Sequence, residues 1–269
     1  MKNYNTALQQ HLGKYAKRRL GVFEKGTWKG RQYAHILPPR LRSLNFLESF
    51  RAELQDHLQS HPKIKLHQYF HHLNSSQAFA LNLFYPYFST GRREARILSA
   101  SLGVDADVLD WEFEAVPVKK EGTNVDVAWR TPAGLQVFCE VKLSESAFGT
   151  AKNDAEHQKK LKDIYRPQLV SIVPEDLLEE KAFFKNYQIL RYIALLTANV
   201  KRKFVILAPR ANQNLLPPLK KVLDRIDSTV RVRIGVVYME DCLRKLQESP
   251  LLSPEFRQYA EKMHEKYVI

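Results

Sequence analysis

The stretch VFCEVKLSE, residues 137–145, decides both the fold and the chemistry that this sequence predicts. Its odd-numbered positions from Val137 to Leu143 are apolar, which predicts a β-strand with one face on a hydrophobic core. Glu140 and Lys142 occupy even-numbered positions and therefore share the opposite face. An acid and a base so placed on a largely apolar strand indicate either a chemical site or a salt bridge on a solvated face.

Two runs of alternating residues precede this strand. They are DWEFEAVPV (110–118) and TNVDVAW (123–129), and the turns KKEGTN (119–124) and RTPAG (130–134) that follow them are short. This spacing predicts a three-stranded antiparallel meander over about 110–143. On its second strand, Asp126 points away from the apolar face. Asp126 is therefore predicted to project beside Glu140 and Lys142.

The rest of the chain predicts an α/β fold, with a mixed central sheet flanked by helices. We expect a buried helix from Ser75 that Pro86 stops, a helix over 185–198, an all-apolar strand over 203–209, a helix over 214–226, a strand over 230–239 and a surface helix over 253–267. The predicted organisation is a basic, mainly helical region over 1–74, a core over 75–245 with an insertion over 145–184, and a C-terminal helix within 246–269.

Charge is the unusual property of the composition. The 269 residues include 42 Lys+Arg against 29 Asp+Glu, a net charge of +13, and residues 1–60 and 201–233 each carry a net +7. Such an excess favours a polyanionic partner, although a basic enzyme with small substrates remains an alternative. Two cysteines, no signal-like N-terminus and no apolar run of 18 residues lead us to expect a cytoplasmic protein without a membrane partner.

The predicted neighbours Asp126 and Glu140 suggest a metal site. Two nearby carboxylates repel each other unless a cation lies between them, and oxygen ligands suit Mg²⁺, for which Mn²⁺ can substitute. Lys142 would orient a water or stabilise charge on a phosphate, so the arrangement predicts phosphodiester cleavage. A second match, Glu179-Glu180-Lys181, lies in a charged segment and is expected to be a solvated helix face.

These residues resemble the signature of the PD-(D/E)XK nuclease superfamily, which has the restriction-endonuclease-like fold. Asp126 and Glu140-Val141-Lys142 match its acid and its Glu-x-Lys, and Gln188 and Tyr192 match the Gln-x-x-x-Tyr of its following helix. The resemblance covers about 75–240. It departs from the family in the missing proline before Asp126 and in the long stretch before Gln188. YAHILP (33–38) and SSQAFALNLF (75–84) also resemble a poorly characterised bacterial group with this fold.

The resemblance implies roles for further residues. Gln188 and Tyr192 would shape the catalytic site, and members often add another acid from the first helix or strand. Glu114 is our candidate for that metal ligand, with Glu112 as the alternative. Arg191 shares the helix face of Gln188 and Tyr192 and is a candidate nucleic-acid contact.

The leading hypothesis is a Mg²⁺-dependent nuclease acting on DNA, with RNA left open. The alternatives are a nuclease-fold nucleic-acid-binding protein or complex subunit with little catalysis, and a small-molecule enzyme that uses Lys142 as a base. Oligomeric state is left open, a homodimer included.

Two weaker signals lie near the N-terminus. Four basic residues are predicted either to contact phosphate or to form an ordinary basic helix end: Lys14, Lys17, Arg18 and Arg19. Five histidines between 57 and 72 raise zinc as a minor alternative to a polar or DNA-facing segment.

Overall fold

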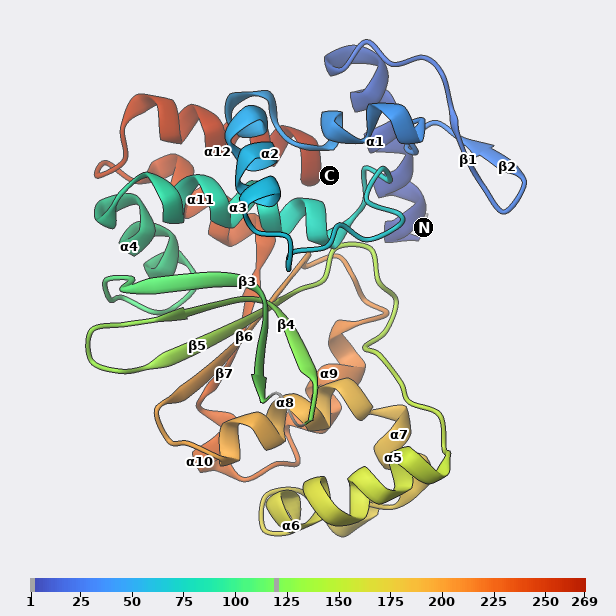
Figure 1. Cartoon of the computed structure of the whole chain (residues 1–269), viewed down its shortest axis with the longest axis vertical. Coiled ribbons are helices and arrows are strands. Elements are labelled where there is room, and N and C mark those ends of the chain that lie inside the picture. Colours follow the sequence, from blue (N-terminus) through green and yellow to red (C-terminus); the bar gives the residue numbers. More distant parts are fainter. Residues whose placement is uncertain (1–2, 119–120) are drawn as a thin grey trace.

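A five-stranded sheet divides the molecule in the computed structural model, which describes residues 3–118 and 121–269 (Figure 1). Its strands follow the order β3 (Asp110–Val118), β4 (Thr123–Arg130), β5 (Gln136–Val141), β6 (Arg202–Ala208) and β7 (Ile234–Tyr238). The first three pair antiparallel, and β6 and β7 continue parallel to β5. The predicted meander and mixed sheet are therefore confirmed, whereas Lys119 and Lys120 of the predicted first turn lie outside the described residues.

Helices cover both faces of the sheet (Figure 1). One layer contains α1 (Tyr4–Arg19), α2 (Arg51–Ser60), α3 (Ser76–Thr90), α4 (Arg92–Ser101), α11 (Met239–Glu248) and α12 (Pro254–Tyr267). The other contains α5 (Ala155–Lys160), α6 (Arg166–Leu169), α7 (Glu180–Lys185), α8 (Tyr187–Thr197), α9 (Leu216–Leu223) and α10 (Ser228–Arg231). A small hairpin, β1 (Gly26–Trp28) and β2 (Arg31–Tyr33), projects from the first layer. No helix in the described ranges is long and apolar enough to span a membrane.

The sheet separates two hydrophobic cores. Strand β6 contributes Val205 and Leu207 to the core under α3 and α11, and Phe204 and Ile206 to the core over α8. A strand buried on both faces needs apolar residues on both, and the buried positions 204–208 are all apolar, as the run over 203–209 predicts. Strand β5 also contributes side chains to both cores, Val137, Cys139 and Val141 to the first and Phe138 to the second. Glu140 follows on the same face as Phe138 and interrupts it with a charged residue.

Three predicted elements differ in detail. The last strand begins at Ile234 rather than near 230, because the Asp227 carboxylate accepts the Thr229 N–H at 2.8 Å and begins α10. Helix α11 was not predicted, and α12 is no plain surface helix, since it buries Tyr259 and other residues against the first core. Strand β3 is irregular: Glu114 has a φ of 52°, and its neighbours Phe113 and Ala115 contact different cores. The register with β4 then shifts between Ala115 and Val118.

Pro86 does not stop α3, which continues to Thr90. A proline within a helix removes the N–H that would bond the carbonyl four residues earlier, here that of Asn82. The buried hydroxyl of Tyr259 replaces this donor and bonds the Asn82 carbonyl oxygen at 2.8 Å. The prediction that the helix ends at Pro86 was wrong because a residue of α12 supplies the missing hydrogen bond.

The substitution Tyr259→Phe should leave the Asn82 carbonyl without its donor and lower the free energy of unfolding by about 1–3 kcal/mol. Adding Pro86→Ala restores a helical N–H, so the double variant should be less destabilised than Tyr259→Phe alone. Urea denaturation of the four members of this cycle measures both effects. Equal stability of wild type and Tyr259→Phe would contradict this explanation of the uninterrupted helix.

Candidate active site

The candidate site lies where β4 and β5 separate. Their antiparallel pairing ends at Val127 and Cys139, so Asp126 and Glu140 are the next residues beyond the last pair. There the Asp126 carboxylate takes the place of a backbone partner, because its Oδ2 accepts the Val141 N–H at 2.7 Å. This hydrogen bond holds Asp126 beside Glu140 at the fork between the strands.

Glu140 is the centre of a polar cluster. It is 5% exposed, and its Oε1 accepts hydrogen bonds from Lys142 Nζ at 2.9 Å and from Gln188 Nε2 at 2.8 Å. Burial alone would lower the pKa of Lys142, but the negative charges of Glu140 and Glu145 outweigh it and raise that pKa. Lys142 is therefore a cation at neutral pH.

Helix α8 provides the second wall of the cluster. The Oε1 of Gln188 accepts the Gly149 N–H at 2.8 Å, and its amide nitrogen also donates to the Tyr192 hydroxyl at 2.7 Å. The Tyr192 ring stacks on Phe204 with centroids 4.2 Å apart. Burial, followed by the charge of Glu140, raises the pKa of Tyr192 well above its ordinary value, so the phenol keeps its proton. The orientations of Gln188 and Tyr192 are thus set by contacts on several sides.

Asp126 also lines an open cleft of about 430 Å³. The opposite side of the cleft comes from the N-terminal region and includes His67, Tyr69 and His72. Burial and the charge of Glu140 raise the pKa of Asp126 well above its usual range, despite the opposing effects of the Val141 N–H and Lys142. Without a cation, the ionised form of Asp126 is therefore disfavoured.

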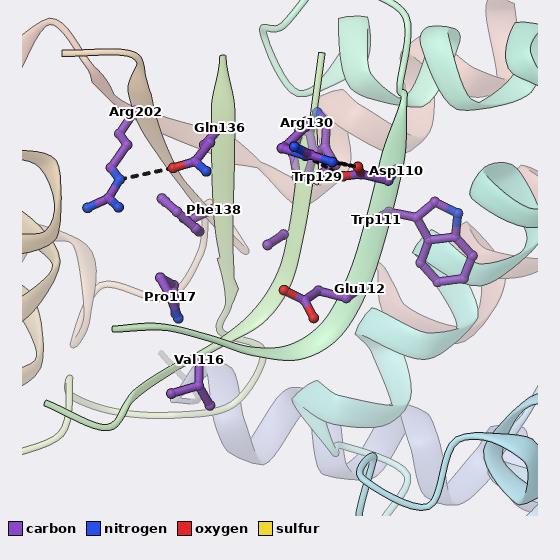
Figure 2. A pocket seen from close by; sticks show the side chains of 11 residues that line it. Asp110, Trp111, Glu112, Val116, Pro117, Trp129, Arg130, Gln136, Phe138 and Arg202 are labelled. Atoms are coloured by element: carbon purple, nitrogen blue, oxygen red, sulfur yellow. Dashed lines mark hydrogen bonds and ion pairs between the residues drawn. The ribbon is translucent and has the colours of Figure 1, made fainter. Parts of the chain in front are cut away.

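The two glutamates of β3 lie in different places. Glu114 lines the cleft with Asp126 and accepts hydrogen bonds from Gln77 Nε2 at 2.8 Å and Asn124 Nδ2 at 2.5 Å. Figure 2 shows Glu112 in a second cleft farther along the sheet, which Phe138 also lines. Of the two alternatives, the structure brings only Glu114 to the cleft that Asp126 lines.

The candidate nucleic-acid contacts do not join this cluster. Arg191 pairs with Glu121 at 2.8 Å and lies over the Tyr187 ring. The basic residues Lys14, Lys17, Arg18 and Arg19 occupy the C-terminal half of α1. Burial, followed by the charges of Glu240 and Glu145, raises the pKa of Tyr4, so the other end of that helix lies nearer Glu145 of the cleft. Thirteen residues of helix separate Tyr4 from Lys17, or about 20 Å.

Sequence reasoning missed several residues of the cleft. Glu145 is the last residue of the stretch 137–145, and its Oε2 accepts hydrogen bonds from the Leu143 and Ser144 N–H groups at 2.7 and 3.0 Å. Asn74 Nδ2 donates to Ser144 Oγ at 2.9 Å and joins the N-terminal region to the end of β5. In the sequence, only its closeness to Lys142 indicated that Glu145 could belong to the cleft. No sequence feature indicated this for Asn74.

Within residues 3–118 and 121–269, no group of three or more His, Cys, Asp or Glu side chains is arranged to hold a metal ion. This statement includes the five histidines for which zinc was considered. The fork instead provides two carboxylates, those of Asp126 and Glu140.

Comparison with known proteins gives one finding that extends over nearly the whole chain. A family model described as "Restriction Endonuclease associating with ARP" matches residues 9–268. No curated protein and no solved structure matches the chain significantly.

The raised pKa of Asp126 predicts that the stability of the metal-free protein decreases with increasing pH. The folded chain binds this proton up to higher pH than the unfolded chain, so the free energy of unfolding falls as pH rises from the unfolded to the folded pKa. Asp126→Asn should therefore stabilise the protein at about pH 8 and have little effect at about pH 4. Urea denaturation in EDTA at both pH values measures this difference.

Added Mg²⁺ should stabilise the wild type at about pH 8 and leave Asp126→Asn unchanged. Glu179→Gln, on an exposed residue, is the control and should respond as the wild type does. If Asp126→Asn is destabilised equally at both pH values, the claim that burial and repulsion from Glu140 disfavour the ionised Asp126 carboxylate would be contradicted.

Proposed function

The chain belongs to the family described as Restriction Endonuclease associating with ARP, and we propose that it is a divalent-cation-dependent nuclease that hydrolyses DNA phosphodiester bonds at the Asp126–Glu140 fork. The observation that carries the proposal is the convergence of Asp126, Glu140 and Lys142 beside an open cleft. A buried ion pair that serves stability alone does not need a second carboxylate directed at it.

The fork fits a hard cation such as Mg²⁺, with Mn²⁺ as a substitute. Among the described residues, hydrogen bonds to Asp126 reach Oδ2 and not Oδ1, so one carboxylate oxygen is available as a ligand. Two protein carboxylates are sufficient, because Mg²⁺ keeps several waters and often takes further ligands from substrate phosphate. Asp126 and Glu140 would hold the ion, with Glu114 close enough for its charge to raise the pKa of Asp126 further. The bound ion would supply Lewis-acid stabilisation and a more acidic water.

Lys142 contributes charge rather than a base. Since its pKa is raised, its ammonium group stays protonated and can stabilise negative charge that develops on the phosphate. This argues against the small-molecule alternative in which Lys142 removes a proton. Gln188 is a positioning residue that bonds both the Gly149 N–H and Glu140, and so holds the carboxylate in one orientation.

One observation favours a second candidate function. The family description contains the word "associating", which fits a subunit of a larger complex. In that case the fold would bind nucleic acid within the complex and contribute little catalysis of its own. The intact cluster of Asp126, Glu140 and Lys142 supports the catalytic proposal instead.

Purified protein should cleave DNA with Mg²⁺ and not with EDTA. Asp126→Ala and Glu140→Gln should each reduce the rate by at least about 100-fold, and Lys142→Ala by about 10²–10³-fold. Gel electrophoresis of circular and linear DNA substrates measures the rate of cleavage and shows whether cleavage requires free DNA ends. Glu140→Gln retains the shape of the side chain, so thermal unfolding should show that the fold persists.

Glu179→Gln is the matched control, because Glu179 belongs to the second Glu-x-Lys match and is exposed at the start of α7. It should cleave at the wild-type rate. Full activity of Glu140→Gln would overturn the assignment of the fork. Metal-independent cleavage would overturn the proposed chemistry.

A further inference from the structure

The β1–β2 hairpin projects from the helical layer that contains α1 (Figure 1). Residues 25–34 contain three basic residues, Lys25, Lys29 and Arg31, and no acid. All three are exposed. The acid just before them, Glu24, is already paired with Arg40. The hairpin therefore presents positive charge without local compensation.

The hairpin also exposes aromatic surface. Trp28 is 36% exposed with Lys29 Nζ 4.7 Å from the centroid of its ring, and the nearby Phe23 is 72% exposed. Solvated aromatic side chains that nothing in the fold covers are typical of contact surfaces. Cations beside an exposed indole suit a surface that combines negative charge with flat apolar groups, as nucleic acid does.

The turn gives the hairpin a defined shape. Trp28 pairs with Arg31, so Lys29 and Gly30 form a two-residue loop with φ of 48° and 73°. Such left-handed values at both positions are those of a type I′ turn, whose twist matches that of the strands. A lysine accepts this conformation less readily than asparagine or glycine. Lys29 at the tip therefore makes the turn less stable than asparagine or glycine would, and it places a positive charge at the tip of the hairpin.

The base of the hairpin is attached to the wall of the cleft. The Gly26 N–H bonds the Ile36 carbonyl at 2.7 Å, and Ile36 in turn pairs with His72, a residue that lines the cleft. The Leu73 N–H donates to the His35 carbonyl at 2.9 Å and extends this attachment. A two-stranded hairpin has little stability alone, so these bonds determine where it points.

We propose that the β1–β2 hairpin enters a groove of duplex DNA and holds the duplex against the cleft that Asp126 lines. The inference rests on the proposed nuclease function and adds the form of the substrate, a double helix. Two strands about 5 Å apart fit the major groove, which is about 12 Å wide and accepts a two-stranded ribbon. Lys29 and Arg31 would contact phosphates across the groove, and Trp28 would pack on sugars or base edges.

The test measures binding of a fluorescent duplex of about 30 base pairs, by anisotropy at several salt concentrations, in the inactive Glu140→Gln background. Lys29→Asn/Arg31→Gln removes two charges and retains the turn, because Asn-Gly is a preferred type I′ pair. It should weaken binding at least about 10-fold and make the log–log salt slope shallower by up to about 1.8. Equal thermal unfolding of parent and variant shows that the fold is intact.

The matched control Lys17→Gln/Arg18→Gln removes two exposed charges near the far end of α1 and should bind like the parent. Equal binding by parent and hairpin variant overturns the role of the hairpin and leaves the nuclease proposal standing. No duplex binding by the parent overturns both. An equal loss of binding on single strands overturns insertion into a groove.

A second readout uses fluorescence. Trp28 is the most exposed of the three tryptophans, so duplex DNA should change the emission of the parent. The change should disappear in Trp28→Phe. An unchanged response in that variant would contradict contact at the hairpin.

Discussion

The hydrogen bond from the Val141 N–H to the Asp126 carboxylate is the contact on which the proposed site depends. At this position an antiparallel ladder would continue with a backbone acceptor, but β4 turns away from β5 and a side chain takes over. The exchange opens the sheet without leaving a donor unsatisfied. It also brings a second acid toward Glu140, and burial together with the charge of Glu140 raises the pKa of Asp126. The fork is thus satisfied in its hydrogen bonding and unfavourable in its charge, a combination that a bound cation would resolve.

A second polar network supports the wall opposite the fork. The Nζ of Lys266 is fully buried and donates to the Asn45 carbonyl and Oδ1 at 2.6 and 2.8 Å. Asn45 Nδ2 in turn donates to the carbonyls of Phe70 and His72. Burial lowers the pKa of Lys266 well below its usual range. The C-terminal helix therefore stabilises the segment around His72, which lines the cleft and pairs with Ile36 at the base of the hairpin.

Local patterns were sufficient to predict the sheet and to select the residues at its fork. Alternation around Glu140 and the continuous apolar run of β6 each determine which faces are buried, because side-chain direction in a strand has a period of two. The end of α3 was mispredicted because the outcome depends on a distant residue, Tyr259, which compensates for Pro86. The ion pair of Arg191 with Glu121 was likewise not evident from the sequence. The positive φ of Glu114 and the direction of α1 also depend on tertiary contacts that no local pattern contains.

The most direct test of the account is a crystal structure of the protein grown with Mn²⁺, with anomalous diffraction recorded at the manganese edge. We expect a peak between the carboxylates of Asp126 and Glu140, at oxygen distances of about 2.0–2.3 Å, and no peak there in crystals of Asp126→Asn. A wild-type crystal with manganese elsewhere and none at the fork would contradict the claim that these two acids form the metal site.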